Sequence, residues 1–370
     1  MQRHYTGLLP SQTIRELLRS GEIAAALPIA DDQVQPASLD LRLGDTAYRV
    51  QASFLPGPNA TVAEKIRQFE MHQIDLSRGA VLERGCVYIV PLAESLSLPP
   101  AIGATANPKS STGRLDVFTR VITDQGTQFD RIRRGYRGPL YAEISPSTFS
   151  VKVRAGSRLN QLRLRRGTAE ALGDQLLRLH DQVALVDGEI DRQEVREHAS
   201  IGLRLDLEGA PGAGIVGYRA KRHSAVIDVD GVGRYDPAEF WEVIAAPQRR
   251  GLILNPGDFY ILATREAVTV PPDHAAEMIA YDTLVGEFRV HYAGFFDPGF
   301  GHAATGGSGS RAVLEVRSHE VPFLLEHGQM IGRLRYERLT GVPDRLYGAA
   351  IGSSYQGQGL ALGKQFARPA

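Results

Sequence analysis

The chain carries one sequence pattern twice, and this duplication restricts its fold to two similar domains. Residues 79–100 begin Gly-Ala-Val-Leu-Glu-Arg-Gly-Cys-Val-Tyr-Ile and end Pro-Pro; residues 251–272 begin Gly-Leu-Ile-Leu-Asn-Pro-Gly-Asp-Phe-Tyr-Ile and end the same way. The same spacing of 172 residues (251 minus 79) relates Glu143 to Glu315, Gly156 to Gly328, Leu162 to Leu334 and Arg163 to Arg335. Ala-Ser-Leu-Asp-Leu-Arg-Leu at 37–43 returns as Ala-Ser-Ile-Gly-Leu-Arg-Leu at 199–205. Since 370 residues suit two domains, we predict domain one over 1–190 and domain two over 191–370.

The composition excludes several classes of protein. The chain is 43% hydrophobic and 23% charged, as in globular proteins, and its 42 basic and 42 acidic residues give no overall attraction to nucleic acid. The single Cys86 excludes an intramolecular disulfide and a multi-cysteine zinc site, and we interpret it as a core residue. No run approaches the ~18 apolar residues of a membrane span and no signal peptide is evident, so a cytoplasmic location without membrane contact is expected.

The apolar runs are short, rich in β-branched residues and bounded by Gly or Pro, which is typical of an antiparallel β-barrel or sandwich. A few short helices are also predicted. One covers Ser11–Ser20, with Thr13 and Glu16 as a capping box; a second covers Thr61–Phe69; a third begins at Asp236. Residues 168–198 are expected to form a helix followed by a polar connector.

A polar segment in copy one combines the groups that bind phosphate. It contains, in order, Lys109, Ser110, Ser111, Thr112, Gly113 and Arg114. Hydroxyls and free backbone N–H groups bind phosphate oxygens, and a guanidinium offers two parallel donors. The glycine spacing is not that of a P-loop, and a solvated turn is the alternative. The aligned segment 281–287 of copy two lacks both the Ser-Ser pair and the Arg, which favours a function over a requirement of the fold.

Both copies keep a glutamate inside an apolar strand, Glu143 and Glu315. Such a side chain either faces solvent on the polar side of the strand or is held in a cleft, where it can act as a general acid or base. A Gly-rich turn precedes each glutamate, with Tyr136 between glycines in copy one and Phe300 in copy two. These aromatic rings either stack on a ligand or belong to ordinary hairpin turns.

Taken in order, these motifs resemble those of dCTP deaminase, an enzyme of the trimeric dUTPase superfamily. The motifs are Ser-Leu-Asp-Leu-Arg-Leu-Gly, Ser-Ser-x-x-Arg, Asp-Pro-Gly-aromatic-x-Gly with Leu-Glu on the next strand, and Tyr-Gln-Gly-Gln near the C-terminus. The resemblance covers nearly the whole chain as two tandem copies. It implies two dUTPase-like (β-clip) distorted antiparallel β-barrels with a few short helices.

The resemblance also implies roles for individual residues. Ser110, Ser111 and Arg114, with Lys109, Thr112 and Gly113 beside them, bind the triphosphate, and Ser111 and Arg114 also serve the deamination. Glu143 or Glu315 is the general base, and Glu143 is favoured because its own copy holds the phosphate segment. Tyr141 and Asp297 contact the nucleotide, and Tyr355, Gln356 and Gln358 close over it. Copy one has Arg133-Arg134 where Asp-Pro is expected, so the two copies look complementary.

The implied reaction is zinc-independent hydrolysis of dCTP to dUTP and ammonia in nucleotide metabolism. No protein-bound cofactor is expected, and Mg²⁺ is expected only as the counter-ion of the nucleotide. The expected partner is the dCTP or dUTP nucleotide, with neither nucleic acid nor membrane, in a homo-oligomer with sites at barrel interfaces. The alternatives are a dUTP pyrophosphatase, a bifunctional dCTP deaminase/dUTPase, and a nucleotide-binding regulator without catalysis.

Overall fold

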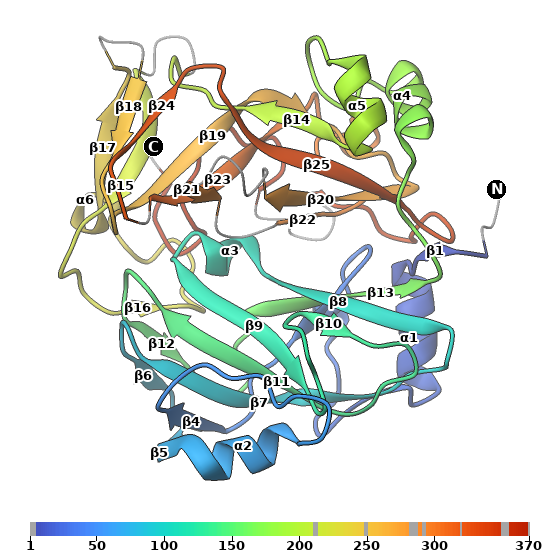
Figure 1. The fold of residues 1–370 in the computed structure, drawn as a ribbon, viewed down its shortest axis with the longest axis vertical. Coiled ribbons are helices and arrows are strands. Elements are labelled where there is room, and N and C mark those ends of the chain that lie inside the picture. Colours follow the sequence, from blue (N-terminus) through green and yellow to red (C-terminus); the bar gives the residue numbers. More distant parts are fainter. Residues whose placement is uncertain are drawn as a thin grey trace. The chain divides into compact units, whose positions relative to one another are not determined.

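The computed structural model describes residues 5–209, 214–247, 251–280, 288–290, 294–318, 320–348 and 355–368, without the side chains of 280 and 288–290. The chain forms two compact units. The first contains residues 1–168, 223–235 and 363–370, and the second contains residues 169–222 and 236–362. Both units are mainly β with antiparallel sheets and short helices, so the predicted fold class is confirmed (Figure 1). Among the described residues, no helix is long and apolar enough to cross a membrane.

The first unit is built on two main sheets and a small one. The strands are β1 Gly7–Leu8, β2 Ile23–Ala25, β3 Leu39–Leu41, β4 Thr46–Val50, β5 Glu70–Asp75, β6 Ala80–Leu82, β7 Val87–Ser97, β8 Ile102–Pro108, β9 Val117–Thr123, β10 Arg131–Ile132, β11 Arg137–Pro146, β12 Val151–Val153, β13 Asn160–Arg166 and β16 Ile227–Asp228. The helices are α1 Ser11–Arg19, the 3-10 turn η1 Asp31–Gln33, α2 Val62–Phe69 and α3 Ser110–Gly113. One sheet runs β5-β4-β7-β11-β9 with β2 on β7, another runs β1-β13-β8-β10 with β3 on β13, and the third is β16-β12-β6.

The second unit repeats the topology of the two main sheets, without counterparts of β1, β2 and β16 among its described strands. Its strands are β14 Ile201–Arg204, β15 Ile215–Ala220, β17 Trp241–Ala245, β18 Gly251–Leu254, β19 Phe259–Val268, β20 His274–Ala280, β21 Phe288–Val290, β22 Phe295–Phe296, β23 Ser310–Ser318, β24 Phe323–Glu326 and β25 Met330–Arg338. Its helices are α4 Gly173–Gln182, α5 Arg192–His198, α6 Pro237–Phe240 and the 3-10 turn η3 Ala303–Thr305. The order β17-β15-β19-β23-β21 matches β5-β4-β7-β11-β9, and β14-β25-β20-β22 matches β3-β13-β8-β10.

The duplication extends to strand register. In the first unit Glu143 lies opposite Ile89, and in the second Glu315 lies opposite Ile261, at the same spacing of 172 residues seen in the sequence. Both units also form an ion pair between the repeated Arg of the Leu-Arg-Leu motif and a buried glutamate that the motifs did not include. Arg42 Nε lies 2.8 Å from Glu94 Oε1, and Arg204 Nη1 lies 3.3 Å from Glu266 Oε1. In each pair the other carboxylate oxygen accepts the backbone N–H of the same arginine.

The predicted helices agree with the structure in part. Thr61 caps α2 in a capping box with Glu64, and the Asp236 side chain accepts the N–H of Ala238 at the start of α6, as predicted. The capping box proposed at Thr13 and Glu16 is wrong, because α1 already begins at Ser11, after Pro10.

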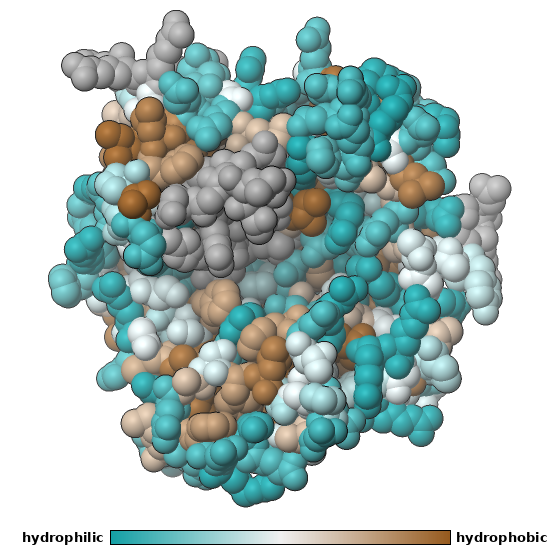
Figure 2. Space-filling view, in the orientation of Figure 1, coloured by the Kyte–Doolittle hydropathy of each residue, from teal (hydrophilic) through white to brown (hydrophobic). Residues whose placement is uncertain are grey.

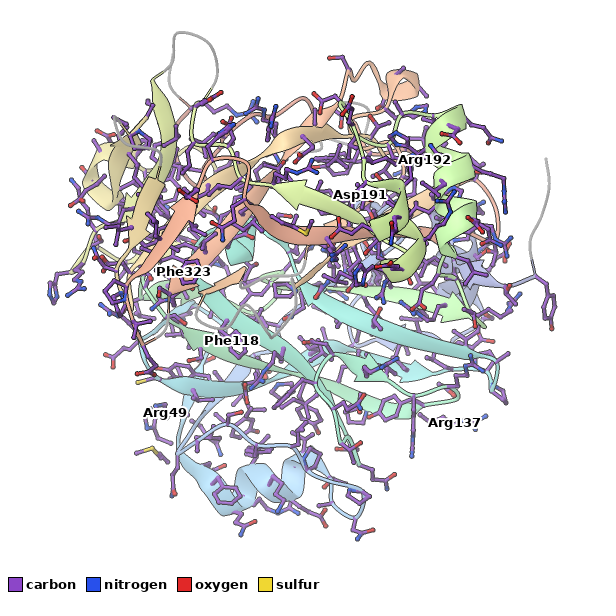
Figure 3. All side chains as sticks on the ribbon, turned by 45° about the horizontal axis from the view of Figure 1, so that its top comes forward. Arg49, Phe118, Arg137, Asp191, Arg192 and Phe323 are labelled. Carbon is purple, nitrogen blue, oxygen red and sulfur yellow. The ribbon has the colours of Figure 1, made fainter. Side chains whose placement is uncertain are left out.

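The connector after the first copy also differs from the expectation, since it contains two helices. Asp191 caps the second of them, α5, by accepting the N–H groups of Gln193 and Glu194 (Figure 3). Leu176, Leu177 and Val195 of α4 and α5 belong to the core of the second unit. The boundary expected near residue 190 therefore falls between two helices that both pack on the second unit. Cys86 lies just before β7 and is only partly buried, so its assignment to the core is wrong.

Two segments from the second half of the sequence complete the first unit. Residues 223–235 supply β16, which pairs in parallel with β12 through Val151 opposite Ile227 (Figure 1). Residues 363–370 follow, and Tyr235 forms a bridge with Phe366. Arg154 on the first-copy side pairs with Asp228 at 2.6 Å. The copies are therefore not two independent stretches of chain.

Candidate active site

The predicted phosphate-binding segment forms the single helical turn α3, directly after β8. Ser111, Thr112 and Arg114 are buried, whereas Lys109 and Ser110 are partly exposed. The N–H groups of Thr112 and Gly113 bond to Lys109 O, and that of Arg114 bonds to Ser110 O. The Thr112 hydroxyl donates to Leu159 O at 3.0 Å, so it anchors the turn. We call residues 109–114 the cradle.

A buried carboxylate from the repeated Ser-Leu-Asp-Leu-Arg-Leu motif supports this cradle. Asp40, on β3, is 1% exposed and its Oδ2 pairs with Lys109 Nζ. Arg158 Nη1 lies 4.0 Å from the same oxygen and forms a two-pronged pair with Asp32 at 2.9 and 3.1 Å. The hydrogen bond from Arg158 holds the pKa of Asp32 below its usual value. Asp40 thus orients Lys109 at the start of α3.

Glu143 lies in the middle of β11 and is 1% exposed. Of the two alternatives, its side chain is therefore held inside the protein and does not face solvent. Its Oε1 accepts two hydrogen bonds from Arg120 on β9, from Nε at 3.1 Å and from Nη2 at 2.5 Å. Its Oε2 is buried and has no hydrogen-bond partner among the described residues. One oxygen is therefore fixed, and the other is available to a ligand or water.

Aromatic rings fix Arg120 in turn. Its guanidinium carbon lies 3.4 Å from the centroid of the Phe129 ring and 4.5 Å from that of Phe118, which Figure 3 labels on β9. Its Nη2 also donates to Ser53 Oγ at 3.0 Å. Tyr141, on β11, belongs to the same group of rings. It packs in a small core with Val62 and Ile66 of α2 and the partly buried Phe129. Figure 2 shows apolar residues reaching the surface near β9 and β11 of this unit.

The aromatic residues of the two Gly-rich turns are structural. Tyr136 is 1% exposed; its hydroxyl donates to Pro139 O at 2.7 Å, and burial raises the pKa of Tyr136 to about 12. Phe300 is 4% exposed and packs against the ring of Phe296 at 5.1 Å. Both rings fill the interior of their own unit. They therefore belong to ordinary hairpin turns and do not stack on a ligand.

The second unit holds its predicted residues in the turn after β22, on β23 and in the tail. Asp297 and Glu315 are 7% and 5% exposed, in the turn and on β23 respectively. Gln356 reaches the turn: its Oε1 accepts Gly301 N–H at 3.3 Å, and its Nε2 donates to Thr305 Oγ1 at 2.8 Å. Gln358 exchanges backbone and side-chain hydrogen bonds with Arg311, at 3.0 and 3.2 Å, and Tyr355 precedes them, partly buried. The tail motif thus folds onto the turn of its own copy.

Within the first unit, the described contacts of Glu143 and those of the cradle share no residue. Glu143 contacts Arg120, whereas the cradle contacts Asp40 and Leu159. Arg120 and Asp40 are the neighbours that sequence reasoning missed as site residues; Asp40 appeared only as part of a motif. The segment 281–287, whose sequence was compared with that of the cradle, lies outside the described residues. Among those described, no three His, Cys, Asp or Glu side chains form a cluster suited to a metal ion.

Comparison with known proteins assigns the family. Residues 5–168 match the family described as 2'-deoxycytidine 5'-triphosphate deaminase (DCD) N-terminal domain, and residues 172–366 match the C-terminal domain of the same family. The chain is similar to the crystal structure of 2'-deoxycytidine 5'-triphosphate deaminase from Agrobacterium tumefaciens, with 57% identity and a TM-score of 0.87, covering 91% of this chain and 100% of that one.

Two shorter relatives match only part of this chain. The "dCTP deaminase, dUMP-forming" of Beutenbergia cavernae is 33% identical over 152 residues, which are 39% of this chain and 74% of that protein. The "dCTP deaminase" of Halorubrum lacusprofundi is 29% identical over 161 residues, 42% of this chain and 75% of that protein. With both of its domains matched in order, a duplicated fold and a structural likeness along nearly its full length, the chain belongs to the 2'-deoxycytidine 5'-triphosphate deaminase family.

Proposed function

We propose that this protein hydrolyses dCTP at C4 of the cytosine ring, giving dUTP and ammonia, with Glu143 as the general base. The observation that carries this proposal is the Glu143 carboxylate, which has Oε1 held by Arg120 and Oε2 buried without a partner among the described residues. A base positioned in this way accepts a proton from one water molecule in a fixed direction. Family membership supports the substrate.

In the proposed reaction, Glu143 takes a proton from water, and the resulting hydroxide attacks C4. The glutamic acid delivers that proton to N3. The carboxylate then takes the proton of the new C4 hydroxyl and passes it to the amine, so C4 becomes a carbonyl, ammonia leaves and the carboxylate is regenerated. Ser111 orients the water, and Arg114 offsets the charge that develops near the nucleotide. Lys109 and Ser110 bind the triphosphate.

The second unit contributes Asp297 and the tail residues Tyr355, Gln356 and Gln358 to nucleotide binding in this proposal. Because the predicted site residues are divided between the two copies, we propose that a complete site forms where barrels meet in a homo-oligomer. The proposed chemistry needs no zinc: the base is a carboxylate, in place of a metal-bound hydroxide. Mg²⁺ would accompany the triphosphate as its counter-ion.

A second product is favoured by the names of several relatives. Proteins from Beutenbergia cavernae and from Parafrankia sp., both 33% identical to this chain, are called "dCTP deaminase, dUMP-forming". If this chain shares that property, deamination is followed by hydrolysis between the α- and β-phosphates, giving dUMP and pyrophosphate. Chromatography of the products after complete conversion of dCTP distinguishes accumulation of dUTP from dUMP with pyrophosphate.

The proposed base is tested by Glu143→Gln. This variant keeps the size of the side chain and its contact with Arg120 but cannot take up a proton, so ammonia release should fall by roughly a thousandfold or more while dCTP binding is retained. The matched control is Glu315→Gln, the equivalent glutamate of the second unit. Unchanged ammonia release by Glu143→Gln would contradict this assignment. If ammonia release fell only in Glu315→Gln, the general base would be the glutamate of the second copy.

A further inference from the structure

The small sheet of the second unit has an open edge where that of the first unit has a third strand. In the first unit β12 pairs with β6 on one side and with β16 on the other, whereas the second unit has only β18 and β24 among its described strands. At the spacing of 172 residues, β24 corresponds to β12 and β18 to β6, with the same register between the two strands. The side of β24 that corresponds to the β16-binding side of β12 therefore carries no described strand. We call this side of residues 322–326 the β24 edge.

The β24 edge presents backbone groups that are paired in the first unit. There, Lys152 O accepts the N–H of Val229 at 3.1 Å. The residue 172 positions after Lys152 is Leu324. Since the N–H and C=O groups of one strand residue point to the same side, Leu324 offers both groups along this edge. An open strand edge of this kind is a template for a strand of another chain.

The solvent side of the same small sheet is apolar in the second unit. Ile253 on β18 and Leu324 on β24 lie directly opposite each other and are 60% and 53% exposed. Val321, just before β24, is 47% exposed. The corresponding pair in the first unit is Val81 with Lys152, so copy two has a leucine where copy one has a charge. Figure 2 shows hydrophobic residues at the surface over β18 and β24.

This difference between the copies indicates which partner fits the β24 edge. In the first unit Lys152 lies opposite Asp228 of β16, so a pair of opposite charges matches that edge to its strand. The β24 edge has Leu324 at this position, and an apolar residue of the partner should lie opposite it. A second copy of the edge meets this condition. When two copies pair antiparallel about a twofold axis at Leu324, leucine faces leucine and Glu326 faces Pro322, so no like charges are opposed.

We propose that the β24 edge is an interface between two copies of this chain, in which the two edges pair as antiparallel strands. The two Leu324 residues would exchange backbone N–H···O hydrogen bonds, and their side chains would form one row with Ile253 of each chain. Removal of these apolar side chains from water stabilises the contact. The inference does not depend on the deaminase proposal, and no motif of the sequence indicates this contact.

Sedimentation velocity of the full-length protein over a range of concentrations tests the interface. Leu324→Lys introduces the residue that copy one has at this position, so the fold should be retained, with an unchanged melting temperature. We expect this variant to have half the molar mass of the wild-type protein and a dissociation constant about a hundredfold higher or more. Two leucines leave the interface and two like charges meet there. The matched control is Val243→Lys, because Val243 is 57% exposed on β17, in another sheet of the same unit; its molar mass should equal that of the wild type.

A cross-link tests the strand pairing directly. In a Cys86→Ser background, Leu324→Cys leaves one cysteine in each chain. Hydrogen-bonded residues of antiparallel strands have Cα atoms about 5.5 Å apart, which is within the range of a disulfide. Mild oxidation should therefore join two chains in Leu324→Cys, and it should not do so in Val243→Cys.

Two results would overturn the proposal. The first is an equal molar mass of the wild-type protein and Leu324→Lys at every concentration, with both proteins folded. The second is cross-linking of Val243→Cys as readily as Leu324→Cys, because random collision would then explain the product. If Leu324→Lys lowered the melting temperature, the cross-link alone would decide: a covalent dimer specific to Leu324→Cys supports the interface, and its absence overturns it.

Discussion

The pairing of Glu143 with Arg120 assigns Arg120 a positioning role. A guanidinium can hold one carboxylate oxygen through two donors while its flat face stacks on an aromatic ring, and Arg120 does both. A lysine at this place would keep the charge but lose the fork and most of the stacking. The direction of Oε2, and with it the path of the proton, would no longer be fixed.

We therefore expect Arg120→Lys to lower kcat for ammonia release by on the order of a hundredfold, the usual cost of a misplaced catalytic group. The KM for dCTP should change by less than about threefold, because Arg120 contacts the proposed general base, Glu143, and is not one of the proposed phosphate-binding residues. Arg49→Lys is the matched control, since Arg49 also stands over a ring, that of Tyr88, in the same unit. Unchanged kcat in Arg120→Lys would show that Glu143 needs no such support.

Single residues also show where sequence reasoning ends. The retention of Glu143 and Glu315 at one spacing predicted that these strand glutamates matter, and both are buried. Arg120 could not be found in this way, because its contact with Glu143 depends on the register of β9 against β11. The pairing of Lys109 with Asp40 joins residues 69 positions apart and has the same origin.

At the scale of strands, the repeated ion pairs connect the Leu-Arg-Leu motif to the long central strand of each unit. Arg42 follows β3 and Glu94 lies on β7; Arg204 ends β14 and Glu266 lies on β19. The Arg42 side chain is 11% exposed, whereas that of Arg204 is 35% exposed. Removing one partner of a buried pair leaves an uncompensated charge, but a partner that reaches water can be solvated.

Glu94→Gln should therefore destabilise the first unit by about 3 kcal/mol. Glu266→Gln should destabilise the second by only about 1 kcal/mol. Hydrogen exchange of the amides in β7 and β19 measures the two opening free energies separately. Each variant serves as the control for the other, and equal losses would mean that exposure of the arginine does not decide the cost.

Elements were predictable where a local signal determines them. Thr61 with Glu64 and Asp236 with Pro237 gave the starts of α2 and α6, because a cap is made within one turn of chain. The start of α1 was misplaced because Thr13 and Glu16 have the spacing of a capping box while lying inside the helix. The two-residue strand β16 carries no local signal, since only its pairing with β12 makes it a strand.

At the scale of the whole molecule, the first unit depends on chain that is distant in sequence. Ile227 is fully buried in it, and Gln365 and Phe366 are 1% and 4% exposed. A chain ending at residue 362 would lose the bonds from Gln365 to Val229 and from Tyr235 to its partners in the tail.

We expect this truncation to raise the amide exchange rates of β12, β16 and α3 in the first unit by about tenfold or more. The exchange rates of β19 and β23 in the second unit should stay as in the full-length protein. Unchanged exchange in β16 would contradict the view that residues 363–368 complete the first unit.

The placement of residues 363–368 in the first unit affects how the protein can fold during its synthesis on the ribosome. A domain made of residues 1–168 alone could fold as soon as it emerged, but this one lacks its last pieces until residues 363–370 have been added. At about 5 to 20 residues per second, the wait lasts roughly 10 to 40 s after residue 168 has been added. The first unit is therefore complete only once these residues have been made, and a product that terminates before them lacks part of that unit.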